Sequence, residues 1–185
     1  MKLSTFANIN SGIYSRTIND GEVYYIQARD FDENRNIARN LVPVLSYTEN
    51  FEKHFLKKGD LLIVAKGSSF LSAVFDGTYK NAVASTVFLI ARVNNESTIL
   101  PEYLSWFLNS PSTQSYLLSL ARGTSIPSIN KKTLLEFDVP VPEIKKQKMV
   151  LELESLRKKE ALLNRKIRKL KESQMNQIIF NSINN

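Results

Sequence analysis

The sequence has 185 residues, of which 43% are hydrophobic, a formal net charge of +7 and no cysteine. This length suits one ordinary domain with an appendage, and the hydrophobic content predicts a packed core. The lack of cysteine excludes disulfide scaffolds, thiolate zinc sites and cysteine nucleophiles. No window approaches the roughly 18 apolar residues of a membrane span and the first residues lack a signal-peptide core, so we expect a cytoplasmic protein with no membrane partner.

The positive charge is concentrated in the C-terminal part of the chain. From Glu143 onward there are 11 Lys and Arg against 5 Asp and Glu, whereas the residues up to Pro142 carry 14 against 13. Clustered cations favour a nucleic-acid partner because binding releases counterions from phosphates. A solvated helix face would give the same pattern. Charge alone therefore leaves both interpretations open.

Short apolar runs separated by turn residues predict a β-rich first half. Strand-forming residues occupy 23–26, and Pro43 favours an extended stretch over 41–47. Residues 48–60 predict a short helix, with Thr48 as its cap and Gly59 at its end. Further strands are expected over 61–65, over 70–75 before the turn at Asp76 and Gly77, and as one long strand over 82–93.

Two short helices are expected next, because prolines at 101 and 111 suit first helical turns. The apolar spacing places six residues inward: Leu104, Phe107 and Leu108 in the first helix, and Tyr116, Leu117 and Leu120 in the second. Trp106 is expected to pack in the core. Residues 133–141 then predict a strand whose buried face carries Leu135, Phe137 and Val139.

No proline or glycine interrupts residues 143–180, which predicts one long helix that begins near Pro142. Apolar side chains recur in it at heptad spacing, at Met149, Leu153, Leu156, Leu163, Ile167 and Leu170. So long a helix cannot bury this row against a small domain, so it needs a partner helix. The expected fold class is α+β: a β-rich globular domain with short helices over 1–141, followed by a long coiled-coil helix over 142–185.

Signatures of catalysis are lacking. The only histidine is His54, and no glycine-rich phosphate loop, nucleophile elbow or HExxH metal motif occurs. Asp138, Glu143 and Lys145 imitate a nuclease constellation, but the last two fall at a helix start and Asp138 alternates with core residues. We therefore expect a binding protein with no catalytic residues, no metal and no cofactor.

Five stretches, in this order and spacing, resemble a target recognition domain and its spacer helix from the specificity (S) subunits of Type I restriction–modification enzymes. They are "KKGDLLIVAKG", "AVASTVFLIARV", "LPEYLSWFLNS", "RGTSIPSINKKTLLEFDVPVPEIKKQ" and the helix that runs through "QMNQIIF". The resemblance covers nearly the whole chain.

The resemblance implies that the globular domain reads one half of a split sequence in double-stranded DNA. Methyltransferase (M) subunits would dock and perform the chemistry, and restriction (R) subunits can join. An S subunit has two recognition domains and two paired spacer helices, whereas this sequence has one of each. It therefore resembles a half-subunit, and two copies pairing through their helices would form a homodimer with a palindromic split target.

The resemblance transfers few DNA contacts residue by residue, so we select candidates by chemistry. Cations, hydroxyls and free backbone N–H groups in loops contact phosphates, and Arg suits guanine. The first candidates lie in and after one loop: Arg122, Gly123, Thr124, Ser125, Ser128, Lys131 and Lys132. The others are Lys66, Ser68, Ser69, Lys80, Arg29 and Arg35.

The cations of the long helix suit either DNA along the spacer or acidic surfaces of partner subunits. They are Lys158, Lys159, Arg165, Lys166, Arg168, Lys169 and Lys171. Two alternatives use the same fold without partner enzymes: a stand-alone DNA-binding regulator and a coiled-coil adaptor whose globular domain binds protein. The near-neutral charge of residues 1–142 keeps the adaptor open, and a salt-dependent DNA-binding assay discriminates between them.

Overall fold

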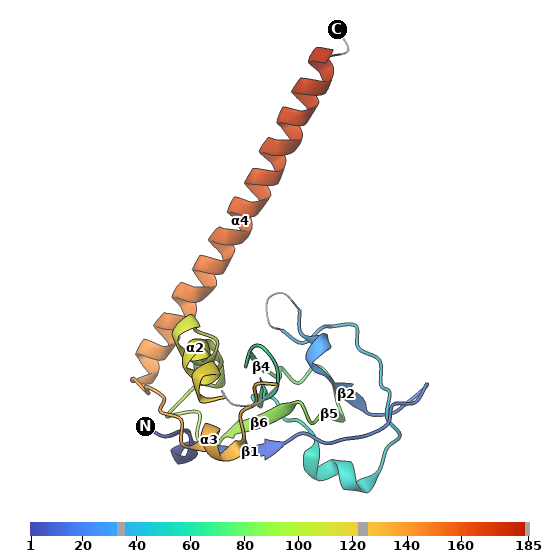
Figure 1. Cartoon of the computed structure of the whole chain (residues 1–185), viewed down its shortest axis with the longest axis vertical. Coiled ribbons are helices and arrows are strands. Elements are labelled where there is room, and N and C mark those ends of the chain that lie inside the picture. The colour runs from blue at the N-terminus through green and yellow to red at the C-terminus, as the bar shows by residue number, and fades with distance from the viewer. Residues whose placement is uncertain (33–35, 122–125, 184–185) are drawn as a thin grey trace. The chain divides into compact units, whose positions relative to one another are not determined.

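The computed structural model describes residues 1–32, 36–121 and 126–183 (Figure 1). The chain divides into two compact units, Met1–Gln147 and Lys148–Asn185. The structural division lies six residues beyond the sequence boundary at 141, because Gln147 is fully buried in the first unit. With its strands and short helices followed by one long helix, the chain has the α+β fold class that its sequence predicts.

The centre of the first unit is a four-stranded antiparallel sheet in the order β1-β6-β3-β4. Its strands are β1 (Ala7–Ser11), β6 (Phe88–Val93), β3 (Leu61–Val64) and β4 (Ser72–Val74). Successive side chains of a strand point to opposite faces. Because Leu61, Leu62 and Ile63 are all buried, both faces of β3 are covered, as its continuous apolar run predicts.

A second sheet pairs β2 (Tyr24–Ile26) in parallel with β5 (Ala82–Ala84). The single strand expected over 82–93 is therefore wrong, since β5 and β6 belong to different sheets. Ser85 donates its N–H to the carbonyl of Ile26 (2.9 Å) and accepts from the N–H of Phe88 (3.0 Å). This turn moves the chain from one sheet to the other inside a run that no glycine or proline interrupts. The stretch expected at 41–47 forms one bridge, in which Leu45 pairs with Val23, the residue directly before β2.

The free edge of β4 is covered by two side-chain amides, one directly after α1 (Pro101–Leu108) and one in α2 (Pro111–Leu120). Asn109, directly after α1, accepts from the N–H of Ser72 (2.9 Å) and donates to its carbonyl (2.8 Å). Gln114 of α2 does the same for Phe70, at 3.0 and 2.9 Å. Paired amides thus occupy the backbone groups through which an edge strand would recruit another chain.

The helix expected within 48–60 is a 3-10 helix, η3 (Glu49–His54), and the predicted cap is wrong because the Thr48 side chain makes no capping hydrogen bond. The backbone carbonyl of Thr48 instead accepts from Phe51 (2.9 Å), three residues on, which is the tighter 3-10 pattern. The predicted end at Gly59 is wrong as well, because the helix ends at His54. Gly59 instead has a φ of +90°, which suits a glycine at the turn before β3.

The strand expected over 133–141 is also wrong, because it begins as a short helix, α3 (Lys131–Leu135). The Asn130 side chain caps this helix by accepting from the N–H of Thr133 (2.8 Å). Leu134 is therefore buried instead of Leu135. The predicted alternation survives only at Phe137 and Val139, which are buried and hydrogen-bond the first residues of the chain through their backbones.

Both proline-initiated helices are present, but the inward face of α2 differs from the prediction. Thr113 and Leu117 are buried, whereas Tyr116 and Leu120 are exposed, so the prediction for these two is wrong. The exposed ring of Tyr116 packs on the buried ring of Phe137, with 5.7 Å between the ring centroids. Trp106 of α1 is half-buried beside Tyr103, with 5.6 Å between the ring centroids. The long helix α4 covers Ile144–Ile183, close to the predicted range (Figure 1).

Candidate nucleic-acid interface

Two of the segments singled out in the sequence meet at the end of β3. Lys66 and Ser128 form an antiparallel bridge, Gly67 donates its N–H to the carbonyl of Pro127 (3.0 Å), and Ile129 donates to that of Ala65 (2.9 Å). These contacts join residues about sixty positions apart. The side chains of Lys66 and Ser128 are exposed. They therefore form one polar surface on a fixed backbone.

Gly67 and Ser68 continue this surface. Gly67 has a φ of +133°, which side chains rarely adopt, so glycine is required for the chain to turn after Lys66. Ser68 is exposed and Ser69 is half-buried before the core residue Phe70. One hydroxyl is therefore presented to solvent.

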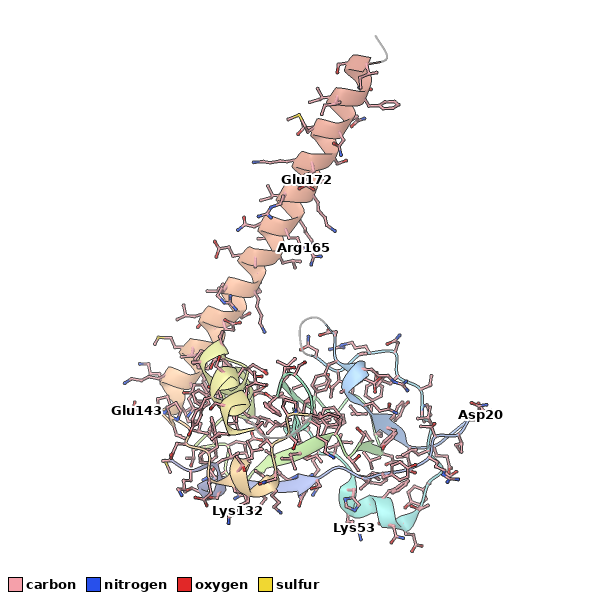
Figure 2. The ribbon with its side chains drawn as sticks, viewed as in Figure 1. Asp20, Lys53, Lys132, Glu143, Arg165 and Glu172 are labelled. Atoms are coloured by element: carbon pink, nitrogen blue, oxygen red, sulfur yellow. The ribbon has the colours of Figure 1, made fainter. Side chains whose placement is uncertain are left out.

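Lys131 and Lys132 stand exposed in the first turn of α3. The Asn130 cap fixes where this turn begins, directly after the segment in which Ser128 bridges to Lys66. Figure 2 shows Lys132 at the surface. The hydrogen bond and the charge of Lys2 lower the pKa of the Glu136 carboxyl, and the charge of Lys132 adds a smaller effect in the same direction. We call Lys66, Ser68, Ser128, Lys131 and Lys132 the bridged cluster.

The remaining candidates are not joined to the bridged cluster by any hydrogen bond or bridge within 1–32, 36–121 and 126–183. Arg29 is exposed in η2 (Ala28–Asp30). Lys80 is exposed after Tyr79, whose hydroxyl donates to the carbonyl of Ala38 (2.6 Å). Five candidates lie outside the described residues, namely Arg35 and Arg122, Gly123, Thr124 and Ser125.

Sequence reasoning missed a polar hollow on the first unit. Its wall is the segment Tyr14–Thr17, and Tyr25, Gln27 and Ser85 complete the lining. The only signal was the polar run "YSRT", which is also ordinary for a surface loop. The three other residues come from β2, its end and the turn after β5, so their convergence depends on sheet pairing that the sequence does not reveal.

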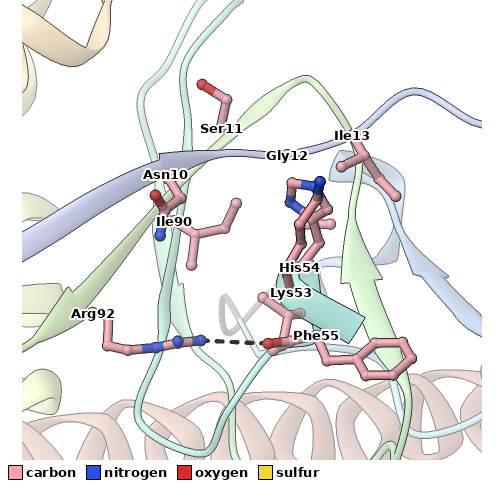
Figure 3. A pocket seen from close by; sticks show the side chains of 11 residues that line it. Asn10, Ser11, Gly12, Ile13, Lys53, His54, Phe55, Ile90 and Arg92 are labelled. Atoms are coloured by element: carbon pink, nitrogen blue, oxygen red, sulfur yellow. Dashed lines mark hydrogen bonds between the residues drawn. The ribbon is translucent and has the colours of Figure 1, made fainter. Parts of the chain in front are cut away.

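His54 lines a smaller pocket, shown in Figure 3, between η3 and the end of β1. Arg92 at its edge donates to the carbonyl of Phe55 (3.4 Å). Asn10 and Lys53 also line it, and none of its lining residues is a carboxylate that could orient a histidine base. Nowhere in the described part of the chain do three or more His, Asp or Glu side chains gather as a metal-binding group.

Asp60 of the "KGDLL" stretch has a structural role. Its carboxylate is 1% exposed and accepts from Arg92 Nε (2.7 Å) and Nη2 (2.6 Å), and from the N–H of Lys57 (2.7 Å). The hydrogen bonds that Arg92 donates to Asp60 raise the pKa of the Arg92 guanidinium, which therefore stays charged. The motif thus fixes the turn before β3 to the neighbouring strand β6.

The second unit presents the heptad residues to solvent. The six side chains of the row are 49–70% exposed: Met149, Leu153, Leu156, Leu163, Ile167 and Leu170. An exposed apolar row of this length is unusual for a monomeric protein. No helix in the described residues is long and apolar enough to cross a membrane.

Comparison with known proteins gives one family. A profile of the Type I restriction modification DNA specificity domain matches residues 1–172. A structure concerned with the assembly and conformational transition of the type I R-M system is 16% identical with a TM-score of 0.65, over 89% of this chain and 39% of that one. Comparison with curated proteins finds no match.

Two further structures have the same fold. The S subunit of a Type I restriction-modification system from M. genitalium is 15% identical with a TM-score of 0.58, over 84% of this chain and 37% of that one. The HsdS subunit from Thermoanaerobacter tengcongensis is 17% identical with a TM-score of 0.60, over 89% and 38%. The chain thus spans about two fifths of these structures. Because the profile matches residues 1–172, the chain belongs to the Type I restriction modification DNA specificity domain family.

Proposed function

We propose that the chain is a DNA-specificity subunit whose first unit reads one half of a bipartite duplex target. The observation that carries this is the family match over residues 1–172, since that family is named for DNA specificity. The bridged cluster supports the proposal, because its exposed cations and hydroxyls stand on segments that backbone hydrogen bonds join. In this proposal Arg29, Lys80 and the candidates outside the described residues make further contacts.

We further propose that α4 pairs with α4 of a second copy through the heptad row. The matched structures are more than twice as long as this chain. A pair of chains would supply two reading units, and closed twofold symmetry would present them to an inverted repeat. The heptad row is apolar and exposed, so pairing would bury it.

The same proposal assigns the chemistry to partners. Methyltransferase subunits, and restriction subunits where present, would dock on this cytoplasmic chain and modify or cleave the DNA. The clustered cations of α4 suit either the DNA between half-sites or acidic surfaces of those partners. The chain's own residues would bind and orient the DNA.

Light scattering coupled to size exclusion tests the pairing, and duplex titration at several salt concentrations tests the binding. A mass near twice 21.1 kDa and an affinity that falls steeply with salt support the proposal. A monomer contradicts self-pairing and leaves DNA reading standing. Salt-independent or undetectable duplex binding contradicts DNA reading and favours the coiled-coil adaptor.

A further inference from the structure

The polar hollow has a lining of one chemical kind. It contains two tyrosines, two serines, a threonine, an arginine and a glutamine, and no carboxylate or aliphatic side chain. Tyr14 is 77% exposed, and Arg16 and Thr17 are also exposed. A lining in which every side chain can donate a hydrogen bond and none is negative suits an electron-rich, anionic partner.

The backbone that carries these side chains is fixed at both ends. Ile13 donates its N–H to the carbonyl of Ala84 (2.9 Å) and Ile18 donates to that of Val44 (2.8 Å). The Tyr25 hydroxyl donates to the carbonyl of Ile13 (2.9 Å). A Cβ on Gly12 would lie 2.0 Å from the carbonyl oxygen of Ser85, so only glycine allows this approach to β5. The segment Tyr14–Thr17 is therefore presented by a rigid scaffold.

The side chains between these anchors are not used by the fold. Within the ranges that the structure describes, no hydrogen bond or ion pair involves the side chains of Tyr14, Arg16 or Thr17. Gln27 is held by its backbone, because its N–H donates to the Asp30 carboxylate (2.7 Å) and its carbonyl accepts from the N–H of Asp30 (3.0 Å). Its side-chain amide lines the hollow and can donate to a ligand and accept from it. Donors that stand on a held backbone and are not used by the fold are what sequence reading needs.

We propose that this hollow is a base-reading site for double-stranded DNA, in which Arg16 and Gln27 read base edges and Tyr14 packs against the backbone or a base. The fork of Arg16 suits the two acceptors of guanine, and the amide of Gln27 suits adenine. This inference rests on the proposed function and deepens it. It assigns sequence discrimination to the hollow, whereas the bridged cluster contacts the phosphates.

The test is selection of duplexes from a random-sequence pool by the full chain, followed by affinity measurement on the selected duplex and on a scrambled one. The first variant, Arg16→Lys, keeps the charge but removes the fork. The second, Gln27→Asn, keeps a side-chain amide but withdraws it from the hollow by one methylene. Arg157→Lys makes the same chemical change on α4 and is the matched control, since Arg157 is exposed and lies outside the hollow.

We expect Arg16→Lys and Gln27→Asn each to lose about tenfold in affinity for the selected duplex, the worth of one bidentate base contact. Binding to the scrambled duplex should stay unchanged, as should the thermal unfolding midpoint. Selection repeated with either variant should relax the preference at particular base positions. The control should match the unaltered chain throughout.

Two other outcomes overturn the inference in distinguishable ways. If the unaltered chain selects a sequence and both variants select the same one with the same affinity, the hollow does not read bases while the proposed function stands. If the unaltered chain enriches no sequence, the proposed function fails and the inference falls with it. Equal losses on selected and scrambled duplexes would reduce the hollow to a phosphate contact and contradict base reading.

Discussion

The side-chain oxygen of Gln147 accepts a hydrogen bond from the backbone N–H of Leu100, 2.9 Å away. The same amide donates to the carbonyls of Thr98 (2.9 Å) and Pro142 (2.7 Å), and Gln147 is fully buried. One side chain therefore ties the first turn of α4 to the residues before α1. Pro140 contributes as well, because its carbonyl accepts from the Tyr103 hydroxyl (3.1 Å). The carbonyls of Pro140 and Pro142 and the amide of Gln147 thus hold the start of α4 within the first unit.

Replacing Gln147 should destabilise the first unit strongly. Gln147→Ala leaves one N–H and two carbonyls of half-buried residues without their partner, which should cost about 2–4 kcal/mol in the free energy of unfolding. Gln147→Glu should cost more at neutral pH, because an ionised carboxylate cannot donate to the two carbonyls. Urea unfolding followed by tryptophan fluorescence measures both. The neighbouring Lys146→Ala removes an exposed side chain and should change little; an equal loss there would refute this role of the amide.

Removing either partner of the Asp60–Arg92 pair should lower the free energy of unfolding, but removing Arg92 should lower it more. Arg92→Ala leaves a carboxylate that is 1% exposed without its guanidinium, and should cost about 2–3 kcal/mol of unfolding free energy. Asp60→Asn should cost less, since the amide oxygen can still accept from Lys57. The control is Arg39→Ala, whose guanidinium is 85% exposed and 3.8 Å from Asp76. Denaturant midpoints measure both effects. A lower midpoint for Asp60→Asn than for Arg92→Ala would contradict the expected order.

Leu162 and Leu163 offer a matched test of helix pairing. They are adjacent and similarly exposed, at 54% and 58%, but only Leu163 belongs to the heptad row. Leu163→Asp should convert a paired chain to a monomer, because a charge cannot be buried in the heptad row. Light scattering measures the mass. Leu162→Asp should leave the mass unchanged. If both variants dissociate, or neither does, the pairing surface is not the heptad row.

The cations of the bridged cluster should act on DNA through charge. Each of Lys66→Ala, Lys131→Ala and Lys132→Ala should weaken binding to all duplexes alike and reduce the salt slope by about one. Titration of a selected and a scrambled duplex at several salt concentrations measures both effects. Lys57→Ala, in the turn before β3, removes an exposed cation outside the cluster and serves as the control. A slope that falls equally for the control would show that only net charge matters.

Periodicity and proline placement predicted the helical parts well. The starts of α1 and α2 at Pro101 and Pro111, the buried strand β3 and the long α4 are all confirmed. Each rests on a local signal that tertiary contacts reinforce. The prediction for the inward face of α2 failed because this helix turns its polar Gln114 to the backbone of Phe70 beside β4, and the adjacent Thr113 is buried. Its most apolar stripe is therefore not its buried one.

The other failures depend on pairing between distant segments. Nothing within 82–93 marks Ser85 as the turn between two sheets, since the decisive partner is the carbonyl of Ile26. At 131–135 the Asn130 cap prevailed over an apolar alternation. The candidate site shows the same division: Lys66 and Ser128 could be named from residue type, but their adjacency and the polar hollow follow from the bridges of the folded chain.

DNA reading by a symmetric pair of chains is tested most directly by the sequence that the unaltered chain selects from a random pool of duplexes. The expected result is a short half-site present twice, in inverted orientation, with a spacer of fixed length between the copies. Failure to enrich any sequence, or enrichment of one continuous asymmetric site, would contradict it.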